Sequence, residues 1–132
     1  MTEPAAAMSF TKLVVDDLEA MARFYGDVYG LTEVMRFQGA VGTEPIDEII
    51  LGRDGQMAGL ILFKYLERST PPLGEVILGF GTPDLAGVTA RCAAAGGTVV
   101  VEPYDPGLAG ASRIAFLADP EGHLAEVIER AS

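Results

Sequence analysis

A single carboxylate interrupts an apolar run close to the C-terminal end of the sequence. Glu126 stands within Leu124-Ala125-Glu126-Val127-Ile128, where β-branched and apolar residues predict a strand. A carboxyl group that loses hydration among apolar neighbours is suited to proton transfer, or to binding a cationic or hydroxylated ligand. An edge position, or a structural hydrogen bond from a backbone N–H, would explain the same residue. We favour the functional role for Glu126.

Few other side chains in the sequence are suited to chemistry. Glu75 follows a glycine at the start of a predicted strand and is the weaker carboxylate candidate, because a solvated surface position explains it equally well. His123, the sole histidine, stands three residues before Glu126, and odd spacing on a strand places two side chains on opposite faces. We therefore expect a solvent-exposed turn histidine. Cys92, the sole cysteine, lies on a predicted helix face and is expected to be a buried structural thiol.

Composition excludes several classes of function. Nineteen acidic and nine basic residues give a formal net charge of −10, which argues against nucleic acid and anionic lipid as partners. The chain has 132 residues, 49% of them hydrophobic, with no apolar run of membrane-spanning length, as expected for one soluble globular domain. No phosphate loop, nucleotide fingerprint or Ser/His/Asp set is visible. Residues 1–7 lack the features of a signal peptide, so we expect a disordered tail and a cytoplasmic location.

The sequence repeats itself at a fixed separation. Asp17-Leu18 recurs as Asp84-Leu85, Gly30 recurs as Gly97, and Gly55 recurs as Gly122. The three pairs have the same offset, since the differences 84 − 17, 97 − 30 and 122 − 55 are equal. A tandem pair of this kind usually packs about a pseudo-twofold axis, and the seam between the halves is a natural place for a ligand cleft.

Each half is predicted to form the element order βαβββ. In the first half we expect strands at 9–15, 31–37, 46–51 and 57–65, with a helix from residue 18 that Asp17 and Gly30 cap. In the second we expect strands at 76–80, 98–102, 113–117 and 123–129, with a helix from residue 85 that Gly96-Gly97 caps. The predicted organisation is a tail over 1–7, modules over 8–68 and 74–130, and a linker over 69–73. Two Gly-rich stretches, 38–45 and 103–112, are either mobile loops over the cleft or ordinary surface loops.

Two segments carry a resemblance to a known family. Phe24-Tyr25-Gly26-Asp27-Val28-Tyr29-Gly30-Leu31 and Asp119-Pro120-Glu121-Gly122-His123-Leu124-Ala125-Glu126 resemble motifs of the vicinal oxygen chelate superfamily. This superfamily includes glyoxalase I, extradiol dioxygenases, and fosfomycin- and bleomycin-resistance proteins. The resemblance implies an α+β fold in which the curved sheets of two βαβββ modules enclose a cleft. It also implies a homodimer.

The resemblance also identifies the positions at which the family's enzymes hold a divalent metal ion. Those enzymes use His and Glu from four strand positions, which here carry Phe10, Gly59, Glu126 and, depending on a gap, either Glu75 or Ile77. Two carboxylates at most remain, enough for Mg²⁺ only with water or substrate completing the shell. We therefore expect no typical metal centre, no cofactor, and neither glyoxalase I nor dioxygenase activity.

A cleft without those ligands is predicted to be apolar and to bind an apolar or aromatic small molecule. The residues expected to contact that ligand are Phe10, Gly59, Ile61, Ile77 and Tyr104, with Arg36 and Arg113 placed to pair with an anionic group. The alternative is an isomerase, epimerase or lyase that uses Glu126, together with Glu75, as a general base or as part of a weak divalent-metal site.

Overall fold

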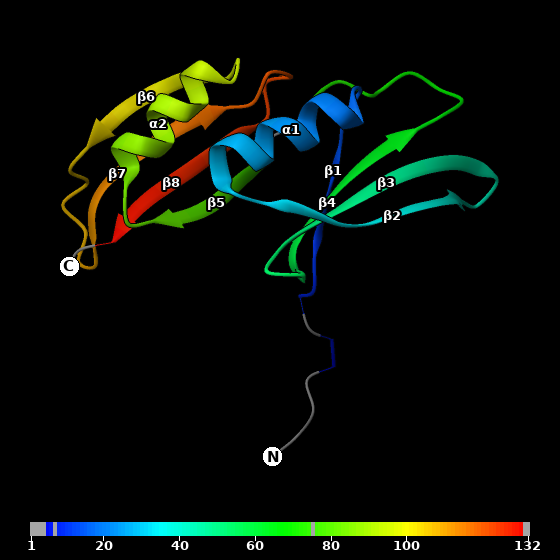
Figure 1. The fold of residues 1–132 in the computed structure, drawn as a ribbon, viewed down its shortest axis with the longest axis horizontal. Coiled ribbons are helices and arrows are strands. Elements are labelled where there is room, and N and C mark those ends of the chain that lie inside the picture. The colour runs from blue at the N-terminus through cyan, green and yellow to red at the C-terminus, as the bar shows by residue number, and fades with distance from the viewer. Residues whose placement is uncertain (1–4, 7, 75, 131–132) are drawn as a thin grey trace.

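Two four-stranded sheets lie next to each other, with both helices packed against the same side of the pair (Figure 1). The computed structural model describes residues 5–6, 8–74 and 76–130. The first module contains β1 (Thr11–Val14), α1 (Leu18–Tyr29), β2 (Thr32–Val41), β3 (Glu44–Arg53) and β4 (Gln56–Tyr65). The second contains β5 (Ile77–Thr82), α2 (Leu85–Ala94), β6 (Thr98–Tyr104), β7 (Ala111–Ala118) and β8 (Leu124–Arg130). The α+β class with two similar modules is confirmed.

The strand order is the same in both sheets. It is β1-β4-β3-β2 in the first and β5-β8-β7-β6 in the second. In each sheet the first strand pairs in parallel with the last, and the remaining pairs are antiparallel. As a result β1 and β5 are edge strands, and we call the space between them the seam.

Both helices begin at the aspartates that the repeat predicts. The Asp17 side chain accepts a hydrogen bond from the Ala20 N–H, and the Asp84 side chain accepts one from the Gly87 N–H. These bonds satisfy N–H groups that have no partner in the first turn of a helix. The matching caps explain why the Asp-Leu pair recurs in both halves.

The C-terminal caps of the two helices differ. Gly30 caps α1 with a φ of 75°, the left-handed conformation that glycine adopts without strain. The C-cap of α2 is Ala95 rather than the predicted Gly96-Gly97 pair, and of these two glycines only Gly96 has a positive φ. A Cβ atom on Gly97 would lie 2.7 Å from Phe24 Cε1 on α1 and 2.6 Å from Cys92 Sγ. Gly97 is therefore required for close packing between the modules rather than for the cap itself.

The stretch predicted as a long loop at residues 38–45 is a β-hairpin. Strand β2 ends at Val41 and β3 begins at Glu44, and a two-residue turn with Gly42 at a φ of 60° joins them. Gly39 lies inside β2, where it pairs with Ile46 of β3, and the ring of Phe37 lies over it. This glycine therefore belongs to a strand and not to a loop. The second predicted loop is shorter than expected, because β6 ends at Tyr104 and β7 begins at Ala111.

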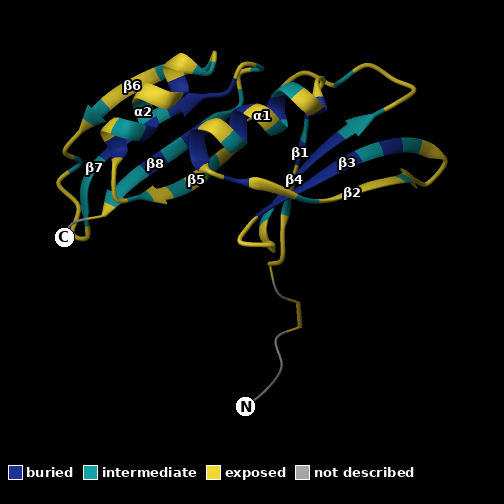
Figure 2. Ribbon diagram, viewed as in Figure 1, coloured by how far each residue is buried: buried dark blue, intermediate teal, exposed yellow. Residues whose placement is uncertain are grey.

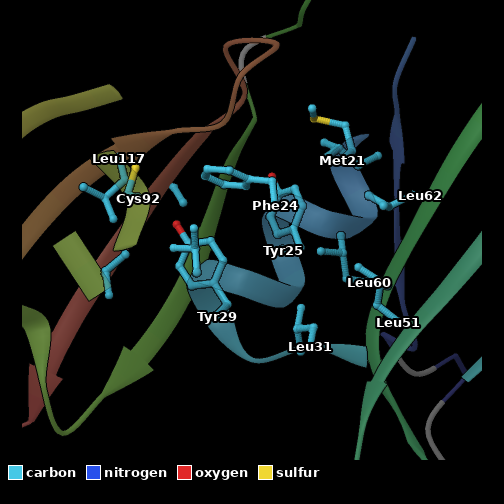
Figure 3. Close-up of a cluster of buried hydrophobic side chains, with 14 of the residues drawn as sticks. Met21, Phe24, Tyr25, Tyr29, Leu31, Leu51, Leu60, Leu62, Cys92 and Leu117 are labelled. Atoms are coloured by element: carbon cyan, nitrogen blue, oxygen red, sulfur yellow. The ribbon is translucent and has the colours of Figure 1, made fainter. Parts of the chain in front are cut away.

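One hydrophobic core joins the two modules. Side chains of α1 contact both sheets, with Met21 on the side of Leu62 and Leu60, and Tyr29 on the side of Cys92 and Leu117 (Figure 3). The Tyr29 ring stacks on Phe80 of β5 at a centroid distance of 3.8 Å. Cys92 is fully buried in this core, as predicted for a structural thiol. In the part of the chain that the structure describes, no helix is long and apolar enough to cross a membrane.

A two-residue bulge in β4 distinguishes the first module from the second. Leu51 of β3 pairs with Leu60, but the next residue, Gly52, pairs with Met57, which leaves Ala58 and Gly59 without partners on β3. Gly59 has a φ of 83°, which allows the chain to make this bulge. The pairing of β7 with β8 has no shift at the equivalent point.

Candidate functional site

Each sheet has a helix face and an open face. The helix faces carry the common core, for example Leu62 in the first sheet and Val127 in the second. Side chains alternate along a strand, so the residues between these core positions lie on the open face. Figure 2 shows that the middle of β3 and β4 is buried, whereas exposed and intermediate residues alternate along β5.

Glu126 lies on the open face of the second sheet. It pairs in register with Gly79 of β5 on one side and with Phe116 of β7 on the other. Its neighbours along β8 on the same face are Leu124 and Ile128. Glu126 is partly buried, and it makes no hydrogen bond or ion pair with the side chains of the described residues. A carboxylate with apolar neighbours and no internal partner is available to a ligand.

The counterpart of Glu126 in the first module is Ile61, not Gly59. The repeat equates Lys12 with Gly79, and these residues pair with Ile61 and Glu126, respectively. Because of the bulge in β4, the offset between the two partners (126 − 61) is smaller by two than the offset of the repeat (79 − 12). The predicted equivalence of Gly59 with Glu126 is therefore wrong. Ile61 has no donor atom either, so this position remains unable to bind a metal ion.

The open face of the first sheet carries an ion pair that the sequence analysis missed. Lys12 Nζ lies 2.9 Å from Glu48 Oε1, and Glu48 is only 6% exposed. The ammonium group also lies over the Phe63 ring, 5.3 Å from its centroid. Like Glu126, Glu48 interrupts an apolar strand, so the signal was present in the sequence. Here, however, the carboxylate is neutralised within the protein.

Two hollows occupy the seam between the modules. The larger of the two, about 420 Å³, lies between β1 and residues 71–74, 76 and 77, and the turn at Gly122–Leu124 closes one side. The smaller, about 250 Å³, is bounded by Gly59 and Leu60 from β4 and by Ile77 to Phe80 from β5. Ile77 lines both hollows, and Gly59 lines the smaller one. Two of the predicted contact residues therefore meet at the seam.

The other predicted contact residues lie in several places. Phe10 is exposed and lies close to Lys12, whose Nζ is 5.8 Å from its ring centroid, and Ile61 is buried on the open face of the first sheet. Tyr104 pairs with Ile114 on the open face of the second sheet.

The two arginines point to the opposite side. Arg36 binds Glu33 and Glu19, the latter on α1, and Arg113 lies 3.6 Å from Glu129. Their register positions are on the helix faces, in line with Leu62 and with Thr82 of β5. They are thus separated from Glu126 by the sheets and are held by carboxylates of the chain. Glu75 lies outside the described residues.

His123 is not the exposed turn residue that was predicted, but a largely buried link between the modules. Its side chain is 9% exposed, Nδ1 lies 2.8 Å from Asp119 Oδ2, and Nε2 lies 3.1 Å from the carbonyl oxygen of Val14. Asp119 also accepts a hydrogen bond from the Tyr25 hydroxyl of α1 at 2.9 Å. The partners on β1 and α1 are distant in the sequence, so they could not be recognised from the local pattern around His123.

The arrangement favours a charged histidine. Both ring nitrogens face acceptors, and only the imidazolium form can donate to both. Burial alone lowers the pKa of His123, but the hydrogen bond and charge of Asp119 raise it more, and the net shift is upward. Burial alone raises the pKa of Asp119, but hydrogen bonds from His123 and Tyr25 produce a net lowering. Burial and the adjacent carboxylate raise the pKa of Tyr25.

A second contact from the same turn fixes the start of α1. The Glu121 carboxylate accepts hydrogen bonds from the N–H groups of Asp16 and Asp17, both at 2.8 Å. A carboxylate at a helix N-terminus is favourable because it meets unpaired N–H groups and the positive end of the helix dipole. The Asp119–His123 turn therefore holds the two modules together.

The described residues do not fit a family-type metal centre. Of the described family positions, Phe10, Ile61 and Ile77 offer no donor atom, and Glu126 offers one carboxylate. Across residues 8–74 and 76–130 no three His, Cys, Asp or Glu side chains converge on a common point where a metal ion could bind. Divalent ions need three or four converging donors in such sites.

The fold and the matched sequence identify the family. A sequence model of the Glyoxalase/Bleomycin resistance protein/Dioxygenase superfamily matches residues 7–127, and the chain belongs to this superfamily. Comparison with curated proteins gives no match.

Solved structures show the same fold. A glyoxalase family protein from Bacillus cereus is 17% identical, with a TM-score of 0.81 over 98% of this chain and 97% of that chain. A glyoxalase-related enzyme from Fulvimarina pelagi is 26% identical, with a TM-score of 0.65 over 92% of this chain and 86% of that chain. Glyoxalase I from Zea mays is 21% identical, with a TM-score of 0.67, and the match covers 95% of this chain but 45% of the maize chain.

Proposed function

We propose that this protein binds an apolar or aromatic small molecule at the seam between its two modules, without a bound metal ion. The observation that carries the proposal is the hollow of about 420 Å³ between β1 and the residues that lead into β5. Its size falls within the range of small-molecule sites, about 300–1,000 Å³. Val14, Leu73, Ile77 and Leu124 are among the apolar residues that line it. This is the manner in which antibiotic-binding members of the superfamily are expected to hold their ligands.

A thermal-shift screen of metabolites and antibiotics tests the proposal. Compounds that raise the unfolding temperature of the wild type are then measured on Ile77→Lys, which places a charge in both hollows. Val100→Lys is the matched control, because Ile77 and Val100 are both 53% exposed and Val100 lines neither hollow. We expect Ile77→Lys to lose the shift and Val100→Lys to keep it. Equal shifts in both variants would place the ligand elsewhere and contradict the proposal.

An enzyme that uses Glu126 as a general base is the second candidate. The position of Glu126 favours it, since this partly buried carboxylate on the open face has apolar neighbours and no internal cation. The reaction would be an isomerisation, epimerisation or elimination next to a carbonyl group. The role of Glu75 in it stays a prediction. Turnover of a screen hit by the wild type but not by Glu126→Gln would favour the enzyme, and recovery of the hit unchanged would favour the binding protein.

We also propose a homodimer. Large apolar side chains remain exposed on the open faces of both sheets: Phe10, Met35 and Phe37 on the first, and Ile77, Val101 and Tyr104 on the second. Exposed apolar patches of this kind are typical of surfaces that a partner covers. Size-exclusion chromatography with light scattering should give twice the chain mass of 13.9 kDa. A mass that stays at one chain at micromolar concentration would contradict this.

A further inference from the structure

Strand β5 has almost no side chains on its open face. The three positions that face this side are Ile77, Gly79 and Gly81. Leu78 and Phe80, which alternate with them, pack against the core on the other side. Glycine therefore occupies two of the three open-face positions of the strand that borders the seam.

The fold does not require either glycine. Neither Gly79 nor Gly81 has a positive φ, so both backbones suit any L-residue. A Cβ atom at Gly79 would meet nothing within 4 Å, and one at Gly81 would make only an ordinary contact with Arg130, at 3.5 Å. Glycine weakens a strand because the unfolded chain is more flexible and no side chain packs. A ligand that approaches the backbone closely is a physical reason to keep such residues.

The exposed backbone lies directly next to Glu126. Gly79 is its register partner on β5, so no side chain separates the carboxylate from the seam on that side. Gly79 also borders two hollows, of about 250 Å³ towards β4 and about 270 Å³ towards Arg130. A molecule lying over Gly79 would thus have Ile77 beside it, the Glu126 carboxylate at one edge and the Arg130 guanidinium at the Gly81 end of the strip.

We propose that Gly79 and Gly81 form a bare strip of backbone on which the flat part of an organic ligand lies, while an amine or hydroxyl group of that ligand donates a hydrogen bond to Glu126. The inference rests on the proposed small-molecule function and defines its ligand class. The carboxylate selects hydrogen-bond donors, with a protonated amine preferred to a hydroxyl, and it repels carboxylates. Because Gly79 has no side chain, a flat ligand can lie directly on the backbone at this position.

Three matched probes test this ligand class: 2-naphthylmethylamine, 2-naphthylmethanol and 2-naphthoic acid. Titration calorimetry on the wild type should show the amine binding at least tenfold more tightly than the acid, with the alcohol between them. Glu126→Gln should reduce the affinity of the amine to that of the alcohol. Every hit from the thermal-shift screen is measured on the same variants.

The strip itself is tested by filling it. Gly79→Val should weaken binding of the amine and the alcohol at least tenfold, with Gly79→Ala between it and the wild type. The unfolding temperature should stay equal or rise, because valine favours strands. Ala40→Val is the control, since Ala40 is exposed on β2 and lines none of the hollows at the seam. It should leave binding unchanged.

The outcomes separate this inference from the proposed function. Undiminished binding by Gly79→Val, or equal weakening by Gly79→Val and Ala40→Val, would overturn the strip and leave a ligand elsewhere at the seam. Tighter binding of the acid than of the amine would overturn the ligand class. Loss of cooperative unfolding in both Gly79 variants would show that the fold needs this glycine and would overturn the inference. If neither the probes nor any screened compound binds the wild type, both proposals fall.

Discussion

The open faces of the two sheets carry different residues at equivalent register positions. In the first module the edge strand supplies Lys12, which is paired with Ile61 in register and neutralised by Glu48 at 2.9 Å. In the second module the edge strand supplies Gly79, and its register partner is Glu126, which has no cation next to it on β5. The first face satisfies its own charge, whereas the second leaves one available.

The helix faces, in contrast, are alike. Both helices begin at an aspartate cap, and both cover apolar side chains of a common core. Packing imposes the same demands on both modules, and the repeat is therefore retained there. The open faces have no such demand in common, so they differ. Because of this difference, the carboxylate that is available to a ligand, Glu126, lies in the second module next to the seam.

The largest effect is expected from removing the cation of the first module. Lys12→Met should lower the free energy of unfolding by about 2–3 kcal/mol at pH 7, because it leaves the buried Glu48 carboxylate without a partner. Urea denaturation of the single variant and of Lys12→Met/Glu48→Gln measures this. The double variant should recover most of the loss. If it is no more stable than the single variant, the pair does not neutralise the first face in the way described.

The link made by His123 should depend on pH. His123→Gln should cost about 2 kcal/mol at pH 5.5, since it removes a charged hydrogen-bond donor from Asp119. The folded pKa is raised, so the stabilisation is complete below the unfolded value of about 6.5 and is lost as the pH rises through the folded value. Asp119, whose pKa is lowered, gives stabilisation that is lost at the acidic end as the pH falls through its folded value.

Unfolding free energies of the wild type and His123→Gln at pH 3, 5.5 and 9 check this dependence. The gap should be largest at pH 5.5. The charged groups near the imidazole are Asp119 and Glu121 from its own turn and Lys12, which lines the same hollow. The polar groups are the Val14 carbonyl of β1, which contacts Nε2, and the Tyr25 hydroxyl of α1, which contacts Asp119. A gap that is constant, or that grows towards pH 9, would contradict a charged His123.

The glycines on the two sides of the seam should respond differently to alanine. Gly59→Ala should destabilise the protein by about 1–2 kcal/mol, because its φ of 83° is unfavourable for a residue with a Cβ atom. Gly79→Ala should cost nothing, or add up to about 1 kcal/mol, because its backbone is unstrained and the space is open. Thermal unfolding of the two variants gives the comparison. Equal destabilisation would mean that both glycines are structural.

A small gain in stability should come from making the second face resemble the first. Gly79→Lys places a cation next to Glu126, as Lys12 is placed next to Ile61, and should add about 0.5–1 kcal/mol. Gly79→Met is the control of similar length without charge. The gain of Lys over Met should disappear in the background of Glu126→Gln. A gain that persists there would show that the lysine does not meet Glu126.

The sequence by itself determined the framework of this protein. The fixed offset of the repeat, the aspartate caps and the alternation of apolar residues predicted two βαβββ modules, because these features depend on local geometry and on which side chains must be buried. Inspection of single positions predicted the burial of Cys92 and the scarcity of metal donors. The potential metal donors can be counted directly in the sequence, and the burial of Cys92 follows from its place on the apolar face of a predicted helix.

Only the tertiary structure decided which residues meet. The bulge at Ala58-Gly59 moved the counterpart of Glu126 to Ile61, and Gly39 proved to be part of a hairpin. Both depend on the pairing of strands, which the sequence of one strand does not specify. His123 and its partner Asp119 form hydrogen bonds with residues of the first module that are far away along the chain. Long-range contacts of this kind form only when the helices and sheets pack, and so no local pattern contained them.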